Sequence, residues 1–405
     1  MRKKIVTFRI FLFLIFLINQ TETFSQRFSN KKISKKISKE KSLDGSSVAF
    51  SLGQLSNSKR IVDYNSDKLM TPGSNVKLLT LFMGLKNFDS FPILNYTKKN
   101  NKFYFWSTGY PLLNHPKKND STVVELLKSQ KDSLIYIIKK NQSKLLGPGW
   151  AWDDVNYYFS PERSTFPIFG NLIKIKKTKN DKNKLDFVPK YFEDNLLAEQ
   201  IDLIDDFKVS NNKDSILIPF RTSDSLFVKL LNIELGKEIG MEFNKLELPK
   251  NFKTVYSNDK TLYELLIQDS DNLIAESIVM MTSGKGSSVF DIERQIKTFQ
   301  NKEFSNWNDK IYWVDGSGMS RYNLLNTEFI LSVLNKIHEI LGKQGIVNLF
   351  PLFPVDLSVL GEHVSFLDFD PGKRISEISN VLVETKLFPH PGGVCAYKLV
   401  SGSKS

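Results

Sequence analysis

Residues 70–77, MTPGSNVK, run directly into the apolar stretch LLTLFM at 78–83. The Pro-Gly pair at 72–73 interrupts the chain, and the apolar run predicts a buried helix that begins near Ser74. On such a helix Ser74 and Lys77 share one face, so their side chains can meet. Burial lowers the pKa of a lysine and lets its amine accept a proton, so this pair predicts an activated serine nucleophile.

The Ser-x-x-Lys spacing is a weak signal when it stands alone, because it recurs in this chain. The same spacing also occurs, for example, at Ser38/Lys41, Ser56/Lys59 and Ser401/Lys404. None of them precedes a comparable apolar run. The sequence after Lys77 therefore favours residues 74–77 as the functional copy, provided that partner motifs exist.

A second motif, Ser270-Asp271-Asn272, opens another apolar run at 273–280. One interpretation is an ordinary helix N-cap, which Ser and Asn favour. The other is a second group of polar side chains beside Ser74 and Lys77. In that case Ser270 passes a proton to a leaving amine, and Asn272 holds a substrate amide. Both interpretations can hold together.

A third stretch, DGSGMSR at 315–321, follows the apolar residues 311–314. Its glycines, Gly316 and Gly318, favour a tight turn at the end of a strand. The structural interpretation is sufficient for these residues by themselves. They indicate a function only in combination with the two serine motifs.

The N-terminus is typical of an exported precursor. Basic residues at 2–4 precede a short apolar core at 10–18, which predicts a cleaved signal peptide over 1–26. This core is too short to span ~30 Å of hydrocarbon, although an uncleaved N-terminal anchor is the alternative. Cys395 is the only cysteine, so no intramolecular disulfide can form. These features indicate the periplasm of a bacterial envelope.

The composition limits the function classes further. The chain has 405 residues, of which 41% are hydrophobic, enough for two or three domains with a sizeable core. With a single cysteine and scattered histidines we expect neither a metal site nor another cofactor, and a Ser-His-Asp hydrolase is hard to place. The histidines are His115, His338, His363 and His390.

The net charge of +12 is concentrated in part at 31–41. Because like charges repel, we predict a flexible, solvated basic leader over 27–46. The alternative is peripheral contact with a membrane or an anionic wall polymer. Nucleic acid binding is not expected, since the export signal removes that partner and no basic-aromatic stripe appears.

Alternation and turn residues divide the rest of the chain. Residues 47–52 and 60–64 predict a hairpin. Strand-like segments recur between lysine-rich loops over 96–244, which predicts an inserted β-rich domain. Helical periodicity returns at 261–267, 273–282, 292–299 and 326–341. The expected main domain therefore combines 47–95 with 245–405.

Taken together, the three motifs resemble the class C low-molecular-mass penicillin-binding proteins, the D-alanyl-D-alanine carboxypeptidase/endopeptidase family. The likeness covers roughly residues 45–350. It includes PGSNVKLLT at 72–80, SDN with Ala-Glu at 275–276, and DGSGMSR at 315–321. Gly109-Tyr110-Pro111 resembles the family's Gly-Asp-Pro, with Tyr110 in place of the acid. Residues 147–154 and 160–163 look like the form found in Bacteroidetes members.

The resemblance implies an α+β protein with the β-lactamase/transpeptidase-like fold, an antiparallel sheet flanked by helices. It implies that Ser74 is acylated by peptidoglycan stem peptides with Lys77 as base, and that Ser270 and Asn272 complete the catalytic set. It also implies an oxyanion hole that includes the backbone N–H of Ser74, and covalent inhibition by β-lactam antibiotics. The implied substrate-binding residues are Asp271, Gly316 and Ser317.

The family's third motif, Lys-Thr-Gly, is absent after Arg321. Thr385-Lys386 is reversed and lacks the glycine, and the likeness ends at about Val355. A frameshifted or truncated tail, a catalytically inactive peptidoglycan-binding relative, and a divergent replacement for the lysine are the alternatives. A β-lactamase shares the first two motifs, but the long insert and residues 315–321 argue against it.

Overall fold

A computed structural model describes residues 30–39, 41, 45–53, 60–178, 184–209, 214–243 and 248–350, together with strands β13 (Glu384–Phe388) and β14 (Val394–Lys398). The predicted signal peptide lies outside the described residues. Within them, no helix has both the length and the hydropathy needed to cross a membrane.

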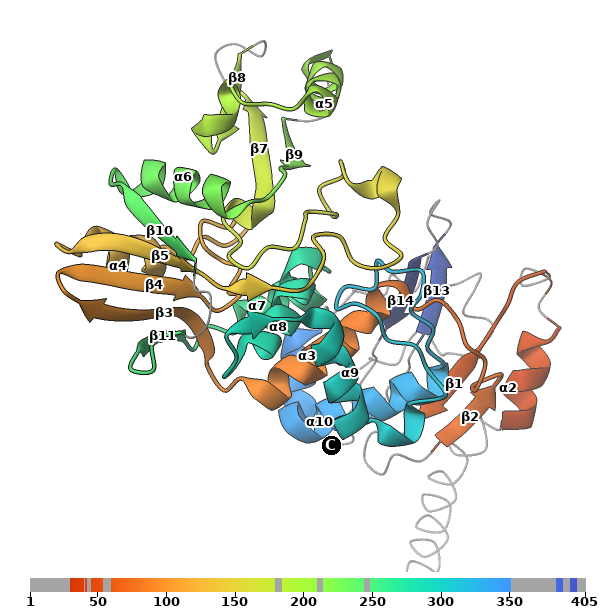
Figure 1. Cartoon of the computed structure of the whole chain (residues 1–405). Coiled ribbons are helices and arrows are strands. Elements are labelled where there is room, and N and C mark those ends of the chain that lie inside the picture. The colour runs from red at the N-terminus through yellow and green to blue at the C-terminus, as the bar shows by residue number, and fades with distance from the viewer. Residues whose placement is uncertain are drawn as a thin grey trace, which may run out of the picture.

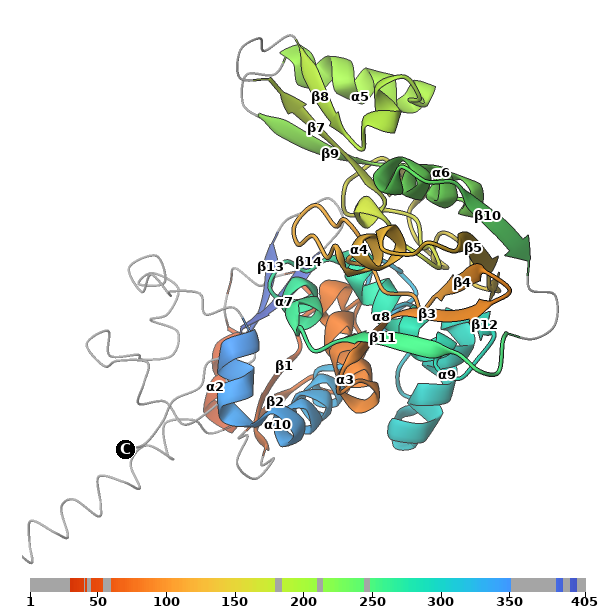
Figure 2. The same ribbon diagram turned by 90° about the vertical axis from the view of Figure 1, so that its left-hand side faces the viewer.

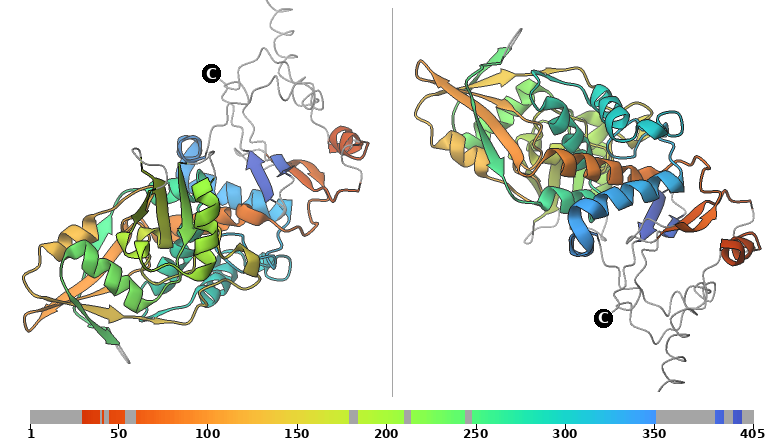
Figure 3. Two further views of the ribbon diagram at one scale, coloured as in Figure 1. Left: turned by 90° about the horizontal axis from the view of Figure 1, so that it is seen from above. Right: turned by 90° about the horizontal axis from the view of Figure 1, so that it is seen from below.

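A bundle of helices forms the centre of the molecule, and its members are α3 (Lys77–Asn87), α7 (Thr261–Ile267), α8 (Asn272–Gly284), α9 (Ile292–Glu303) and α10 (Thr327–Leu349). Residues 77–84 of α3 and 273–282 of α8 are buried without interruption. A helix that is apolar all round must be covered on every side. Helix α3 accordingly packs against α7, α8 and α10. Figure 3 shows α10 running alongside α3.

The predicted hairpin is present as β1 (Phe50–Gly53) and β2 (Arg60–Tyr64), which pair antiparallel. The basic leader, however, contains helix α2 (Asn30–Ile37). Ile33 and Ile37 lie four residues apart on one face of α2 and are buried against Leu52 and Val62. For residues 30–37 the prediction of a flexible leader is therefore wrong, because this apolar pair anchors the helix despite its lysines.

Between α3 and α7 the chain forms a five-stranded sheet, in the order β10-β5-β4-β3-β11 (Figure 1). Its strands are β3 (Phe91–Lys99), β4 (Lys102–Ser107), β5 (Ser133–Ile138), β10 (Ile239–Phe243) and β11 (Lys253–Ser257). Strand β3 pairs antiparallel with β4 and β11, whereas β5 pairs parallel with β4 and β10. Helices α4 (Thr122–Lys128) and α6 (Asp224–Leu235) accompany the sheet and contact each other.

A smaller antiparallel sheet projects from this region, in the order β8-β7-β9. Its strands are β7 (Leu172–Lys177), β8 (Leu185–Val188) and β9 (Ser215–Pro219), and helix α5 (Ala198–Val209) lies beside them (Figure 2). The predicted insert at 96–244 contains all of this sheet. The larger sheet starts before the predicted insert, at Phe91, and ends after it, at Ser257.

Two further short strand pairings lie next to the helical bundle, and one of them joins it to the sheet region. Strand β6 (Lys140–Asn141) runs parallel to β12 (Val289–Phe290), which follows α8. At the other end of the bundle, β13 and β14 form an antiparallel hairpin, and β14 lies against the turn that precedes α3. The bundle helices and the largely antiparallel sheets occupy mostly separate parts of the chain, with α4, α5 and α6 lying among the strands, and the predicted α+β class is confirmed.

Truncation of Leu79 in α3 should be costly, because this side chain is completely buried at the centre of the bundle. We expect Leu79→Ala to lower the free energy of unfolding by ~2–5 kcal/mol, as is usual for large-to-small core changes. Leu145→Ala is the matched control, since Leu145 is 44% exposed. Urea unfolding followed by circular dichroism measures both, and equal stabilities of the two variants would contradict this packing.

Candidate active site

The serine lies where a tight turn becomes a helix. The 3-10 turn η3 (Gly73–Val76) leads into α3, and Lys77 is the first residue of the α-helix. The Asn75 side chain donates to the carbonyl of Pro72 at 2.6 Å, which fixes the turn. Backbone N–H groups at a helix start lack intrahelical partners and favour negative charge. Ser74 is therefore held at an electropositive position.

The Lys77 amine is the centre of the site, and the side chain is only 2% exposed. Its Nζ lies 3.1 Å from Ser74 Oγ, 2.5 Å from Asn272 Oδ1 and 2.8 Å from the carbonyl oxygen of Ser317. These acceptors come from η3, from the start of α8 and from the 315–321 loop. The three sequence motifs therefore meet at one nitrogen atom.

Burial controls the charge of this amine. Loss of solvation lowers the pKa of Lys77 to about 8, from an ordinary value of 10.5. Asp315, Asp271 and Glu276 act in the opposite direction, because their negative charges favour the ammonium form. A substantial fraction of Lys77 is consequently neutral just above physiological pH.

Asp315 organises the loop that supplies the Ser317 carbonyl. Its carboxylate is completely buried and accepts hydrogen bonds from several donors at once. The donors are the Gly318 and Ser320 N–H groups at 2.9 and 2.7 Å, Asn323 Nδ2 at 2.7 Å and Trp150 Nε1 at 2.8 Å. A carboxylate satisfied by so many donors stabilises a single loop conformation.

Glu276 and Arg163 support the same loop from the other side. Glu276 Oε1 accepts the Ser317 N–H at 2.8 Å, and its Oε2 accepts from Arg163 Nε at 2.8 Å. Arg163 also reaches Glu293 with Nη1 at 3.0 Å. Burial raises the pKa of Glu276, and the positive charge of Arg163 opposes that rise. The Ser317 peptide is thus held at both its N–H and its carbonyl.

Gly318 permits the close contact between this loop and the serine turn. It has a φ of +85°, and a Cβ on it would lie 1.9 Å from the carbonyl oxygen of Gly73. Gly316 is similarly restricted, since its Cβ would lie 2.8 Å from the Ala275 carbonyl oxygen. The Thr80 hydroxyl donates to the Gly316 carbonyl at 2.6 Å. The Gly-Ser-Gly sequence is therefore required by packing against η3 and α8.

The residues of the second motif have different surroundings. Asn272 contacts Lys77 through Oδ1 and donates from Nδ2 to the Phe159 carbonyl at 2.7 Å. Asp271 caps α8 by accepting the Ile274 N–H, and its other oxygen lies 3.6 Å from Lys117 Nζ. Ser270 is exposed with a φ of +52°, and no hydrogen bond between described residues joins it to Ser74 or Lys77.

Several contributors at the site carry no sequence signal of their own. The Ser317 carbonyl is a backbone group, and Gly316 and Ser317 are both buried. Trp150 and Arg163 come from the 147–163 loop. The sequence of this loop resembles that of family members, but it does not reveal which residues the two side chains contact.

Tyr110 stands where the family has an acid. Its hydroxyl donates a hydrogen bond to Asp120 at 2.7 Å, and the side chain is buried.

Two further observations concern the borders and chemistry of the site. Strand β14 lies beside η3, so a strand flanks the turn that carries Ser74. Among the described residues, no group of three or more His, Cys, Asp and Glu side chains could hold a metal ion. The described groups provide a serine, an amine and an amide.

Comparison with known proteins shows which family this chain matches. Residues 29–194 and 210–356 match the D-Ala-D-Ala carboxypeptidase 3 (S13) family. D-alanyl-D-alanine carboxypeptidase DacB of Haemophilus influenzae is 24% identical over 377 residues, covering 80% of this chain and 77% of that protein. The family match stops at 356, close to the position where the sequence likeness was expected to end.

Solved structures show the same fold. Penicillin binding protein 4 (dacB) from Haemophilus influenzae matches with a TM-score of 0.60 and 17% identity, covering 92% of this chain and 94% of that chain. The same protein complexed with a novel β-lactam matches with a TM-score of 0.51 and 16% identity, covering 92% and 93%. At these identities the likeness establishes the fold alone.

The Gly318 contact leads to a stability prediction. Gly318→Ala adds a Cβ to a residue with positive φ and also forces it against the Gly73 carbonyl, so we expect a loss of at least ~2–4 kcal/mol. Gly236→Ala is the matched control, because Gly236 has a φ of +64° but open space around its Cβ position. Thermal unfolding should show a clearly larger drop for Gly318→Ala. Equal drops would show that backbone strain alone matters there.

Proposed function

Since the chain belongs to the D-Ala-D-Ala carboxypeptidase 3 (S13) family, we propose that it is a serine-type D-alanyl-D-alanine carboxypeptidase/endopeptidase whose acyl-enzyme forms on Ser74. Its substrates are peptidoglycan stem peptides. The family assignment supports the reaction class, and the geometry around Lys77 supports the choice of residues.

One observation carries the assignment of nucleophile and base. A neutral amine has two N–H groups and one lone pair. Asn272 Oδ1 and the Ser317 carbonyl are fixed acceptors that can take both N–H groups. The lone pair is then directed to the remaining neighbour, Ser74 Oγ at 3.1 Å. This arrangement prepares Lys77 to accept the serine proton.

The proposed reaction follows from these contacts. Ser74 Oγ attacks the carbonyl carbon before the terminal D-alanine while its proton passes to Lys77. The carbonyl oxygen becomes an oxyanion, which the N–H of Ser74 at the helix start stabilises. The C–N bond breaks as the oxyanion collapses, and the proton held by Lys77 passes to the leaving amine with help from Ser270. Water then hydrolyses the ester and releases Ser74.

The predicted substrate-binding residues take more specific roles in this proposal. Gly316 and Ser317 are buried, so we infer that they act through their backbone carbonyls, Ser317 by binding Lys77 and Gly316 by binding Thr80. Asp271 caps α8 and thereby positions Asn272. Asn272 is half-buried and contacts both Lys77 and the 147–163 loop, which is consistent with a place at the edge of the substrate cleft.

The proposed location and partners follow from the export signal and the family. A cleaved signal peptide at 1–26 would deliver the chain to the periplasm, where peptidoglycan is available. β-Lactams would acylate Ser74 covalently, as substrate analogues. Contact of the basic leader with a membrane or an anionic wall polymer stays a prediction.

The missing Lys-Thr-Gly motif leaves an inactive peptidoglycan-binding relative as the alternative. The contact between β14 and η3 supports the active form, because a strand borders the serine turn even without that motif.

We expect purified protein to be labelled covalently by a fluorescent penicillin, and Ser74→Ala to lose the label completely. Ser38→Ala is the matched control, since Ser38 has the same Ser-x-x-Lys spacing but lies at the end of α2. Gel fluorescence measures labelling, and circular dichroism establishes that each variant is folded. Absence of label on folded wild-type protein would favour the inactive relative.

The rate of labelling should rise with pH. Lys77 accepts a proton only in its neutral form, and its pKa lies at about 8. The neutral fraction therefore grows ~tenfold between pH 7 and pH 9 and levels off above that. Labelling with subsaturating penicillin, quenched after fixed times at each pH, measures the rate as a function of pH. A rate that is flat, or that falls, over this range would exclude Lys77 as the base.

A further inference from the structure

A second pocket, of about 700 Å³, lies at the opposite ends of the two catalytic helices. Helix α3 begins at Lys77 and ends at Asn87, and α8 begins at Asn272 and ends at Gly284. Residues at both C-terminal ends line the pocket, and the five-stranded sheet forms its other wall. With a rise of 1.5 Å per residue, α8 separates this pocket from Asn272 by ~20 Å.

Lys139, between β5 and β6, lines this pocket and is 4% exposed. Within the described part of the chain, its ammonium has no ion-pair or hydrogen-bond partner, and its contact is the Phe290 ring at 3.9 Å. Burial alone lowers the pKa of Lys139 to about 8. Its Nζ lies 3.3 Å from the position of a Cβ on Gly284, at the end of α8.

Trp106 lines the same pocket, and its Nε1 is buried without a hydrogen-bond partner among the described residues. Phe105 pairs with Tyr136 in the sheet. Strand alternation therefore places Trp106 and Lys139 together on the opposite face. A buried N–H without an acceptor is unfavourable, and a lone buried ammonium is more unfavourable still. Two donors without a hydrogen-bond partner among the described residues thus share one pocket.

The remaining lining gives the pocket its chemical character. Its charged side chains are Lys139, Lys250, Lys285 and Asp89, so positive charge is in excess. Apolar contact is available from the side chains of Phe88, Phe252 and Met281. A ligand that suits this lining carries an anionic acceptor group on an apolar body.

We propose that this pocket is a carboxylate-binding site, with Lys139 as the ion-pair partner and the Trp106 indole N–H as a second donor. The ligand class is a carboxylate attached to an aromatic or other apolar body, either as a free acid or as the C-terminus of a peptide. This site is separate from the catalytic serine, and the proposal does not depend on the enzymatic activity.

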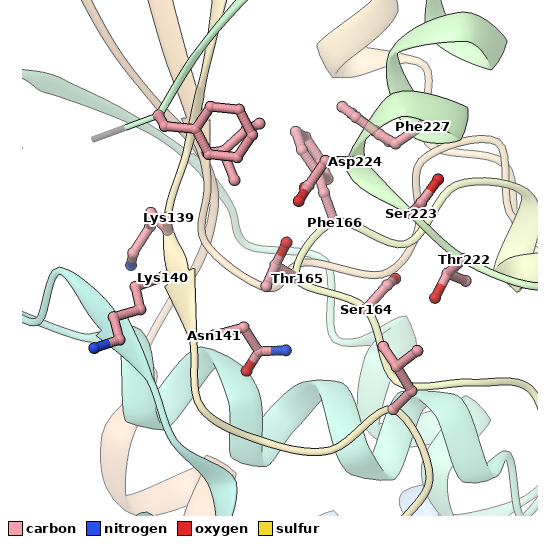
Figure 4. Close-up of a pocket in the computed structure, with 13 residues that line it drawn as sticks. Lys139, Lys140, Asn141, Ser164, Thr165, Phe166, Thr222, Ser223, Asp224 and Phe227 are labelled. Carbon is pink, nitrogen blue, oxygen red and sulfur yellow. The ribbon is translucent and has the colours of Figure 1, made fainter. Parts of the chain in front are cut away.

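Lys139 also lines a neighbouring pocket of about 530 Å³, which fits this ligand less well. Figure 4 shows Asp224 and Thr165 across that pocket from the segment that carries Lys139 and Lys140. The Asp224 carboxyl would meet an incoming carboxylate there. Burial raises the pKa of Asp224, which reflects the cost of a negative charge at this position. The anion site is therefore assigned to the pocket at the helix ends.

Calorimetric titration of the full chain with benzoate tests the proposal. We expect saturable binding of benzoate and none of benzamide, its neutral counterpart. Lys139→Met should weaken benzoate binding at least tenfold, and Trp106→Phe should weaken it less. Lys140→Met is the matched control and should bind as the wild type does. N-acetyl-Gly-Phe, compared with its C-terminal amide, distinguishes a peptide terminus from a free acid as the ligand.

A fold control accompanies the titration. Lys139→Met removes an unpaired buried charge and should melt at or above the wild-type temperature. If Lys139 instead has only a structural role at the end of α8, the variant will melt lower and bind benzoate as well as the wild type. That result, equal binding of benzoate and benzamide, or no saturable benzoate binding by the wild type would overturn the proposal.

Discussion

The rest of the site depends on the burial of the Lys77 amine among three fixed acceptors. A lysine in that position tolerates burial only if each of its hydrogens has a partner, and the partners come from η3, α8 and the 315–321 loop. Each of those segments has its own support. Asp315 and Glu276 fix the loop, Asp271 caps α8, and continuous apolar burial fixes α3.

This constraint also explains the arrangement of charge in the core. Asp315 and Glu276 are carboxylates in a place where charge is costly, yet each accepts several hydrogen bonds. They restrain the Ser317 peptide and partly offset the effect of burial on Lys77. The pKa of the base is therefore set by a balance between desolvation and nearby negative charge, and this balance suits a serine carboxypeptidase that must exchange a proton in every turnover.

Much of the helical bundle could be predicted from the sequence, because apolar periodicity at 78–83 and 273–280 is a direct consequence of burial. The pairing of Ser74 with Lys77 could be predicted from their spacing. The role of the Ser317 carbonyl could not be predicted, since any residue can supply a backbone acceptor. The role of Arg163 could not be predicted either, because its partner Glu276 is distant in the sequence. Helix α2 is hard to predict from the sequence, because repulsion among its lysines opposes a helix and the two isoleucines that anchor it are a weak signal. The role of Ser270 stays a prediction.

The positions of the Lys77 acceptors in the sequence also determine when the active site can form during synthesis and folding. Ser74 and Lys77 leave the ribosome long before residues 272 and 317, which complete their surroundings. Until those later segments are synthesised and packed, Lys77 is solvated and its pKa keeps the ordinary value of a lysine. Its amine is then protonated and cannot activate Ser74. The chain therefore carries its own safeguard during synthesis and export: a reactive nucleophile exists only in a molecule that has finished folding.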